Sequence, residues 1–552
     1  MKKELHISVK IAFVLIGLII LNVIASSVFT RFDLTQDKRY TLSEASKNTL
    51  TTVKTPMIIT VFLKGDLPTE YKRLADETEQ LLQEFSAHND NVAYVFIDPI
   101  KENETERLAS YGMEPRYITE EAANKVSREV VYPWAVATHN DKTVKIQLYK
   151  NNVASSNEEK IANSVQHLEY AFADAFTKLT LIEKQTIAIL KGNDELDDIY
   201  IASFVQSLRD YYRIAPFDLS AFPDDPIKTL KNLARFDLAI IPKPTKKFSE
   251  QDKYILDQYT MQGGKSLWLV ETAQAELDSI RAKGKTLAFP RDLGLQDFFL
   301  NYGIRINPKL VNDMQCAAIG MEFGEGNNAQ YLPVQWRYNP LAQTDLNHPI
   351  TNNTNLVRFE FANEIELLKR GPEKTVLLKS SPQSKLEGIP KEIYLNVIEN
   401  EPAPETYQGK GNQNLAVLLE GMFQSAFLGK PKKPFQLKDA KNKGESKMLV
   451  ISDGDVIKNQ ISRGQPQELG YDIITKRQYG NKEFLLNSVN YLLDNNGLIN
   501  IRSKQLKLAF LDTQKVTDEK GYWQWINIGF PLAILAVFGI VFTYIRKRKF
   551  AK

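Results

Sequence analysis

The acidic residues best placed to do chemistry together lie in Ser452-Asp453-Gly454-Asp455, directly after the apolar run Met448–Ile451. In open α/β sheets, ligands gather at the carboxyl ends of strands, so two carboxylates there could bind a cation or a polar ligand. Asp and Gly are also the usual residues of an Asx-type turn that starts a helix, and the pattern favours this turn. Ser452, Asp453 and Asp455 are therefore the candidate ligand residues.

Other residues that commonly do chemistry are scattered. Cys316 is the single cysteine, which excludes an internal disulfide and a Cys-based metal site. There is no H-E-x-x-H zinc motif and no G-x-S-x-G nucleophile elbow. The five histidines show no ligand spacing: His6, His88, His139, His167 and His348. The sequence thus predicts no catalytic residue, no metal and no cofactor, and a protein that is not an enzyme.

A possible phosphate-binding loop, Gly263-Gly264-Lys265-Ser266, fails on two counts. A P-loop requires a glycine five residues before the glycine that precedes its lysine. That glycine is Gly264 here, and the position five residues before it holds Tyr259. The segment also closes an expected helix and precedes a strand, whereas a P-loop follows a strand and opens a helix. Capping of the helix C-terminus by glycine explains it better, so no ATP hydrolysis is expected.

The elements that must position these residues follow an α/β pattern. Thr41–Glu44 fits a capping box and predicts a helix to about Val53. From Pro56 a βαβ unit and a hairpin around Asn140-Asp141 predict a compact domain with a thioredoxin-like start, although it has no cysteine for redox chemistry. Its expected elements are strands Met57–Leu63, Val92–Ile97, Val130–Ala137 and Thr143–Leu148 and a helix Tyr71–Ala87. Glu158–Leu179 is apolar at spacings of three and four and predicts a bridging amphipathic helix.

A second α/β series begins at Thr186. Short apolar strands alternate with helices, which predicts a doubly wound, parallel-rich sheet. The expected strands are Ile187–Leu190, Leu238–Ile241, Leu267–Val270, Thr375–Leu378 and Met448–Ile451, and the expected helices are Ile199–Tyr211, Glu250–Met261 and Lys482–Leu493. Residues 430–447 are rich in lysine and predict a solvated loop.

The two ends of the chain carry its longest apolar runs. Ile11–Phe29 has 19 residues without a charge, and spans roughly 28 Å as a helix. A cleavable signal peptide with a site near Ala25 and Ser27 is the alternative, but apolar cores of signal peptides are usually about 7–15 residues long. Trp525–Ile545 is a second run of 21 uncharged residues. Its expected membrane-interface anchors are Tyr522, Trp523, Trp525, Tyr544, Arg546, Lys547, Arg548 and Lys549.

Charge predicts the orientation of these spans. The chain of 552 residues has a formal net charge of +3, of which the first ten residues carry +2 and the last seven +5, leaving −4 between them. The basic tails place both termini in the cytoplasm and the bulk of the chain beyond the inner membrane, in the periplasm. The middle offers no basic field for nucleic acid.

Several long segments resemble one family of bacterial proteins. They are Arg31–Leu50 (RFDLTQDKRYTLSEASKNTL), Phe248–Glu271, Leu300–Cys316, Asn414–Phe427, Ser452–Asn459 and Gly480–Lys504. These segments are similar to the gliding-motility-associated ABC transporter auxiliary proteins of the GldG type, found in Bacteroidetes-like bacteria. The resemblance implies a non-enzymatic subunit, labelled substrate-binding, whose permease and ATPase are separate chains. It also implies a second domain resembling a class I glutamine amidotransferase without its Cys–His machinery.

The expected fold is an extracytoplasmic body of two α/β domains, the first with a thioredoxin-like βαβ start and the second a flavodoxin- or glutamine-amidotransferase-like sheet, flanked by two transmembrane helices. The expected parts are a cytoplasmic tail (1–10), a first span (11–29), a juxtamembrane helix (30–55), a first α/β domain (56–150), a bridging helix (151–185), a second α/β domain (186–505), a linker (506–524), a second span (525–545) and a basic tail (546–552).

The expected function is an auxiliary, substrate-capturing subunit of an ABC transporter linked to gliding motility, with further envelope motility or secretion components as partners. A mechanical scaffold in the envelope and a tethered hydrolase using Asp453 and Asp455 are the alternatives.

Overall fold

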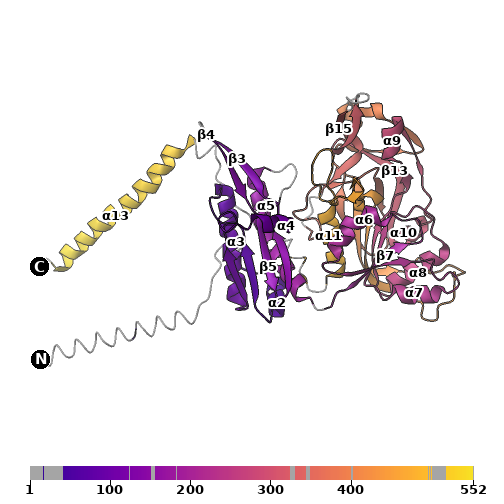
Figure 1. The fold of residues 1–552 in the computed structure, drawn as a ribbon, viewed down its shortest axis with the longest axis horizontal. Coiled ribbons are helices and arrows are strands. Elements are labelled where there is room, and N and C mark those ends of the chain that lie inside the picture. The colour runs from indigo at the N-terminus through magenta and orange to yellow at the C-terminus, as the bar shows by residue number, and fades with distance from the viewer. Residues whose placement is uncertain are drawn as a thin grey trace. The chain divides into compact units, whose positions relative to one another are not determined.

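The computed structural model describes residues 41–122, 125–150, 156–181, 183–323, 330–343, 348–398, 402–494 and 518–550, together with 17, 497, 499 and 501. The chain divides into two compact units, residues 1–505 and 506–552. Figure 1 shows the fold, and each unit is described by itself.

The first domain is built on a mixed four-stranded sheet in the order β2-β1-β5-β6. β1 (Met57–Val61) and β2 (Val92–Phe96) are parallel and joined by α3 (Thr69–His88), as the βαβ pattern predicts. β5 (Trp134–His139) and β6 (Lys142–Gln147) form the predicted hairpin, and Asn140 in its turn has φ of 52°.

The prediction of one strand over Val130–Ala137 is wrong. This stretch contains the end of β4 (Lys125–Val131), which pairs with β3 (Arg116–Ala122), and the start of β5. Pro133 lies between them, and its ring nitrogen has no hydrogen with which to continue a ladder. A short helix, α4 (Thr105–Ser110), precedes β3.

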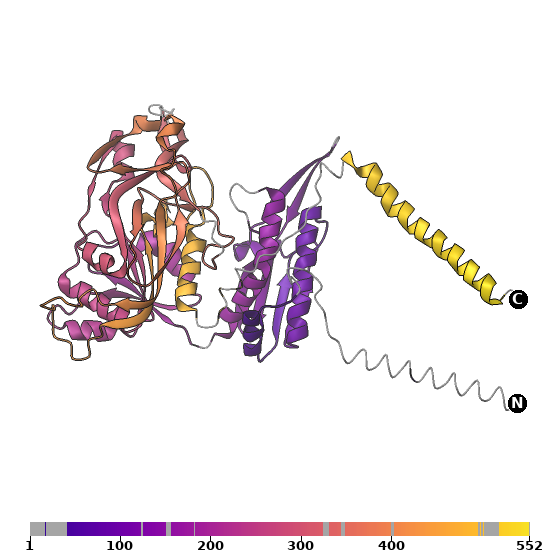
Figure 2. The same cartoon turned by 180° about the vertical axis from the view of Figure 1, so that it is seen from behind.

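Helices cover one face of this sheet. α2 (Glu44–Thr52) is present, but Ser43 and not Thr41 caps it, because the Ser43 hydroxyl accepts from the Ser46 amide at 3.2 Å. α5 (Asn157–Thr180) confirms the predicted amphipathic helix and begins with a capping box between Ser156 and Glu159. α3 and α5 run side by side (Figure 2), and the rings of Phe85 and Phe176 pack 5.1 Å apart between them.

A seven-stranded sheet forms the centre of the second domain, in the order β18-β21-β22-β10-β9-β7-β8. Five strands are parallel: β7 (Thr186–Lys191), β8 (Arg213–Asp218), β9 (Leu238–Pro242), β10 (Lys265–Leu269) and β22 (Lys443–Ile451). Numbered along the chain, these five lie in the order 2-1-3-4-5, one of the two common orders of doubly wound sheets. β21 (Asn414–Gln424) and β18 (Glu373–Lys379) extend the sheet in antiparallel fashion.

Both faces of this sheet are covered, which explains why its strands read as continuous apolar runs. α6 (Asp198–Leu208) and α11 (Asn481–Leu493) share one apolar cluster with Ile187, Leu267 and Leu449. On the other face, α7 (Pro226–Leu233), α8 (Glu250–Met261) and α10 (Gln296–Tyr302) pack around Trp268.

Glycine ends α8, as the sequence predicts. Gly263 has φ of +96°, and the Gly264 amide donates to the Tyr259 carbonyl at 2.9 Å. A Cβ on Gly264 would lie 2.4 Å from the Tyr259 ring. Gly263 and Gly264 therefore terminate α8, and Lys265 and Ser266 begin β10, so the segment is not a phosphate-binding loop.

A β-rich insertion lies between β10 and β22 and carries α9 (Leu277–Lys283), and no element within residues 271–370 was predicted. Its three small sheets have the orders β11-β12-β20, β17-β13-β19 and β14-β15-β16. They pack around Trp336, Tyr338 and Phe361. Their strands are β11 (Ala273–Gln274), β12 (Lys285–Pro290), β13 (Ile304–Asp313), β14 (Cys316–Phe323), β15 (Gln330–Ala342), β16 (Val357–Arg358), β17 (Asn363–Leu367), β19 (Ser384–Gly388) and β20 (Lys391–Tyr394).

Short elements complete the domain. The predicted loop over 430–447 is wrong from Lys443 onward, because β22 begins there and pairs with Gln424 of β21. β23 (Ile461–Ser462) and β24 (Gln465–Pro466) form a small hairpin. The domain also contains the 3₁₀ turns η2 (Leu395–Ile398), η3 (Pro404–Thr406) and η4 (Gly454–Ile457).

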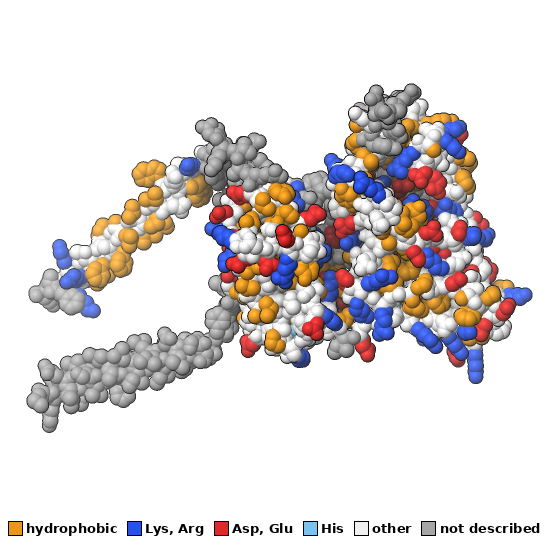
Figure 3. Space-filling view, viewed as in Figure 1, with side chains coloured by type: hydrophobic (Ala, Val, Ile, Leu, Met, Phe, Trp, Pro, Cys, Tyr) orange, Lys and Arg blue, Asp and Glu red, His pale blue; other side chains and the backbone are white. Residues whose placement is uncertain are grey.

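The second unit contains the helix α13 (Lys520–Phe550). Within the part of the chain that the structure describes, this is the one helix long and apolar enough to cross a membrane. Figure 3 shows apolar side chains along it and basic side chains toward its C-terminal end. The four predicted aromatic anchors lie on it, and Arg546 and Lys547–Lys549 occupy its last turns. The predicted first span, residues 11–29, lies outside the described residues except for Gly17.

Candidate functional site

The site lies where three neighbouring parallel strands of the large sheet end. Lys243 follows β9, Glu271 comes two residues after β10, and Ser452-Asp453-Gly454-Asp455 follows β22. Because β9, β10 and β22 are adjacent and parallel, their carboxyl ends meet at one edge of the sheet. The topology thus brings together residues that are more than 200 positions apart in the sequence.

Two of the three predicted ligand residues, Ser452 and Asp453, form hydrogen bonds that fix the loop after β22. The buried Ser452 hydroxyl donates to the Asn363 carbonyl at 2.6 Å. Asp453 accepts from the amide of Asp455 at 2.7 Å and from that of Glu360 at 2.5 Å, so it caps η4. The turn that the sequence favoured is therefore present, and both carboxylate oxygens of Asp453 already have donors.

Asp455 instead pairs with a buried lysine. The ammonium of Lys243 lies 2.6 Å from Asp455 Oδ2 and 3.6 Å from Glu271 Oε1, and Lys243 is only 6% exposed. Lys243 has φ of +54°, a left-handed conformation that is unusual for a residue with a Cβ. A Cβ on Gly454 would lie 2.3 Å from Lys243 Cγ, so glycine is needed for the turn to approach the lysine.

The same residues form the one group within the described residues whose ligand atoms could together hold a metal ion. One oxygen from each of Glu271, Asp453 and Asp455 lies within 4.8 Å of the others. The Lys243 ammonium already contacts two of these carboxylates, and the Arg291 guanidinium pairs with Glu271. The donor set therefore fits a metal poorly, because an internal lysine supplies the positive charge that a cation would bring.

Burial and charge give these acids different pKa values. Burial raises the pKa of Glu271 to about 7, against the opposing effect of Lys243. Burial also raises the pKa of Asp453, and the neighbouring Asp455 and Glu271 act in the same direction. For Asp455, burial acts to raise the pKa, but Lys243 and Lys458 outweigh it and hold the pKa below its ordinary value. Asp455 is therefore the carboxylate that stays charged.

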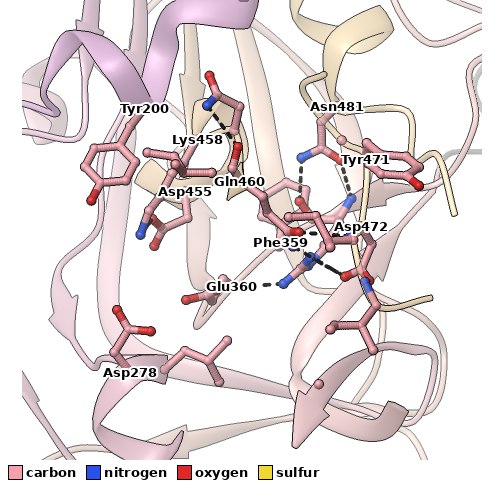
Figure 4. Close-up of a pocket in the computed structure, with 18 of the residues that line it drawn as sticks. Tyr200, Asp278, Phe359, Glu360, Asp455, Lys458, Gln460, Tyr471, Asp472 and Asn481 are labelled. Carbon is pink, nitrogen blue, oxygen red and sulfur yellow. Dashed lines mark hydrogen bonds and ion pairs between the residues drawn. The ribbon is translucent and has the colours of Figure 1, made fainter. Parts of the chain in front are cut away.

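Next to Asp455 lies a cavity of about 610 Å³. Figure 4 shows Tyr200, Asp278, Glu360, Asp455 and Lys458 around it. They come from α6, α9, the loop after β16, η4 and the loop after η4. The cavity thus joins the edge of the large sheet to the β-rich insertion.

One wall of this cavity is a fixed charge network. Arg358 lies 3.0 Å from Asp472 and 3.6 Å from Glu360. Asn481 accepts from the Arg358 amide at 3.0 Å and donates to the Arg358 carbonyl at 2.8 Å, so the first residue of α11 holds this strand end in place. Burial raises the pKa of Glu360, and the charge of Asp455 adds to that effect.

The remaining candidate groups lie elsewhere. Burial raises the pKa of the Cys316 thiol to about 12, which leaves it unreactive at neutral pH. His139 shares a hydrogen bond of 2.8 Å with the Thr55 hydroxyl, and His88 Nδ1 lies 2.8 Å from the Glu84 carbonyl oxygen. Burial lowers the pKa of His348 to about 4. His167 packs on the Tyr170 ring, and His6 lies outside the described residues.

Sequence reasoning missed Lys243, Glu271 and the cavity. A usable signal existed, because both residues directly follow the predicted apolar strands Leu238–Ile241 and Leu267–Val270 within two positions. The carboxyl-end rule that singled out Asp453 and Asp455 applies equally to those two strands. Arg358 ends β16 and Asp472 follows β24, two strands that the sequence pattern did not predict.

The second domain matches the model of a known protein family. A model of the family described as an ABC-type uncharacterized transport system, an ABC transporter auxiliary family, matches residues 184–488, which is more than half of the chain. The chain belongs to this family. A domain of unknown function (DUF7088) matches residues 36–138, the region of the first sheet.

No curated protein matches the chain. Among solved structures, the mmIFT52 N-terminal domain is similar at 13% identity and a TM-score of 0.33, covering 56% of this chain and 99% of that one. A likeness at this TM-score carries no inference about fold or partners.

Proposed function

We propose that this chain is a non-catalytic, membrane-anchored auxiliary subunit of an ABC transporter, with its α/β domains outside the cytoplasm. The observation that carries the proposal is the family match over residues 184–488, which includes the large sheet and the cavity. Helix α13 supports the anchor by its length and apolar composition. The subunit would associate with a permease and with a separate ATPase chain.

The finer parts of the proposal rest on the ends of the chain and on the resemblance described above. Basic residues in the last turns of α13 favour a cytoplasmic C-terminus. Lys2, Lys3 and Lys10 before residues 11–29 favour a second anchor with a cytoplasmic N-terminus. The bulk of the chain would then lie in the periplasm, attached to the inner membrane. We assign the complex to gliding motility and to contact with other envelope components on the resemblance alone.

A non-catalytic role agrees with the state of the acid pair. A hydrolase would need one carboxylate free to act as a base and one able to donate a proton. Asp453 is bound by two backbone amides, and Asp455 is paired with Lys243. To act as a general acid or base, either residue would first have to break these hydrogen bonds or this ion pair.

The test of this proposal is purification of the full-length tagged chain in a mild detergent. We expect the permease and the ATPase to be recovered with it in fixed proportion. A chain in which residues 525–545 are replaced by an unrelated apolar helix of equal length is the matched control for non-specific detergent capture. Recovery of the wild-type chain as a lone monomer would contradict the proposal.

Membrane orientation can be tested separately with single cysteines. Lys101 is exposed on the first domain, and Lys547 follows the apolar part of α13. In a Cys316→Ala background, a membrane-impermeant maleimide added to intact spheroplasts should label K101C and not K547C. The reverse pattern, or labelling of neither until the membrane is opened, would contradict an extracytoplasmic body.

A further inference from the structure

The sign of the charge around the cavity indicates what it would bind. Five carboxylate residues line it, against three basic residues. The acids are Glu276, Asp278, Glu360, Asp455 and Asp472, and the bases are Arg281, Arg358 and Lys458. Figure 4 shows Asp278, Glu360 and Asp455 around the same open space.

All three basic residues are already paired. Arg281 lies 3.2 Å from Asp278, Arg358 lies 3.0 Å from Asp472, and Lys458 lies 3.5 Å from Asp455. An anionic ligand would have to compete with a carboxylate for each of these cations. The cavity is therefore poorly suited to a phosphate or carboxylate ligand.

The acidic residues, in contrast, include carboxylate groups that these ion pairs do not fully satisfy. Asp455 Oδ1 accepts no hydrogen bond from the described residues, and the Asp455 side chain is only 10% exposed. The Lys458 ammonium lies 3.5 Å from this oxygen and makes an ion pair but no hydrogen bond with it. A carboxylate oxygen without a donor costs free energy, and Asp455 is one of the residues that line the cavity. Glu276, at the rim, has no ion-pair partner within the described part of the chain.

Aromatic side chains supply the remaining walls. Tyr200, Phe359 and Tyr471 line the cavity. The Lys458 ammonium lies 5.4 Å from the centre of the Tyr200 ring, so this ring already attracts a cation. Rings beside carboxylates form a combination that recognises ammonium and guanidinium groups. Leu277 and Ile474 offer apolar surface for the carbon part of such a ligand.

We propose that this cavity binds a small organic cation, an amine or guanidinium compound, whose N–H groups contact the carboxylates of Asp455 and Glu276. Its volume of about 610 Å³ falls within the range of roughly 300–1,000 Å³ that is usual for small-molecule sites. The inference deepens the proposed function, since it gives a substrate or effector class to the auxiliary subunit. It does not require the transporter partners, because the described residues of this chain alone line the cavity.

The test is calorimetric titration of the full-length chain in detergent with arginine, using citrulline as the matched neutral probe. Citrulline has the same length but carries a ureido group in place of the guanidinium. A second pair, 1,4-diaminobutane and 1,4-butanediol, applies the same comparison to an ammonium. We expect binding of arginine or diaminobutane at least tenfold tighter than that of its neutral counterpart. Equal affinity within both pairs, or no binding of any probe at millimolar concentration, would overturn the proposal.

Two variants test whether the ligand binds in the cavity. Glu276→Gln changes an exposed rim residue without an ion pair, so the fold should be unaffected, and Asp455→Asn removes the buried charge. We expect each to weaken binding of the cationic probe about tenfold or more, which corresponds to roughly 1.4 kcal/mol. Asp292→Asn, which changes an exposed carboxylate paired with Lys247 outside the cavity, is the control and should bind normally.

If Asp455→Asn does not fold, Glu276→Gln alone decides the matter. Unchanged affinity in Glu276→Gln together with a folded Asp455→Asn would refute the site. Failure here leaves co-purification with the permease unchanged, so the two proposals fail independently.

Discussion

Two aspartates of the second domain, the buried Asp257 and the largely buried Asp455, have opposite surroundings. Asp257, on α8, accepts from the Tyr302 and Ser425 hydroxyls and the Ala426 amide at 2.7–2.9 Å. These donors are neutral, and burial raises the pKa of Asp257. Asp455 is held mainly by the cations Lys243 and Lys458, has one oxygen that accepts no hydrogen bond within the described part of the chain, and borders a cavity.

The difference separates a carboxylate that has only neutral donors from one that keeps its charge beside a cavity. Asp257 joins α8 to α10 and to the end of β21, and its oxygens have all the donors they need. Asp455 carries charge at the carboxyl edge of a doubly wound sheet, where ligands of such folds bind. Burial alone does not distinguish the two residues; the nature of the partners and the neighbouring cavity do.

The largest expected effect comes from Lys243→Met. This change leaves Asp455 and Glu271 buried without their shared cation, and removal of one partner of a buried pair usually costs about 3–5 kcal/mol. A fall of that size in the free energy of unfolding should appear as a lower thermal midpoint. The double variant Lys243→Met/Asp455→Leu should recover much of the loss; equal destabilisation of single and double variants would show that the ion pair is not the cause.

Asp257→Ala should cost about 3 kcal/mol, because the Tyr302 and Ser425 hydroxyls and the Ala426 amide lose their acceptor. Urea unfolding of the full-length chain measures the change. Unlike the changes at Asp455 and Glu276, this one should leave binding of arginine by the folded protein unaltered. Weaker binding in the folded variant would contradict the distinction between the two aspartates.

Gly454→Ala tests the close approach of η4 to Lys243. The new Cβ would lie 2.3 Å from Lys243 Cγ, and such overpacking costs about 1–3 kcal/mol. Gly388→Ala, at a glycine with no heavy atom near the added Cβ, is the matched control. Thermal midpoints of the two variants should differ by the strain at Lys243; similar midpoints would show that the loop yields easily.

The smallest effect concerns pH. The pKa of Glu271 is about 7 in the folded chain and near its ordinary value of 4.5 in the unfolded chain. Between these values the folded state holds more protons, so this group makes stability fall as pH rises from about 4.5 to 7. Glu271→Gln should flatten the pH dependence of the unfolding midpoint in that window. A profile identical to that of the wild type would place the titrating group elsewhere.

Much of the second domain could be predicted from the sequence because its signals are local. Glu250–Met261 is a helix over the predicted residues, with Ser249 and Asp252 forming a capping box at its start. The apolar runs before Lys243, Glu271 and Asp453 are parallel strands as expected. These strands are buried on both faces, so their composition is uniform and easily recognised.

The β-rich insertion could not be predicted in the same way. β13 contains Pro308, which the strand accommodates where its register with β17 shifts between Asn307 and Leu310. β15 contains Pro333 and Pro340 and mixes polar with apolar residues, so its sequence resembles a loop. The cavity depends on this insertion, which supplies Asp278 and Arg358. For that reason the shape of the cavity could not be predicted from the sequence.

Site-specific photo-crosslinking in native membranes tests the transporter role most directly. A photoreactive amino acid is placed at successive positions from Trp525 to Ile545, the apolar part of α13. If the chain is an ABC transporter subunit, crosslinks to the permease should recur every three or four positions, along one face of the helix. Absence of any permease adduct at every position, in membranes that contain both proteins, would contradict the account.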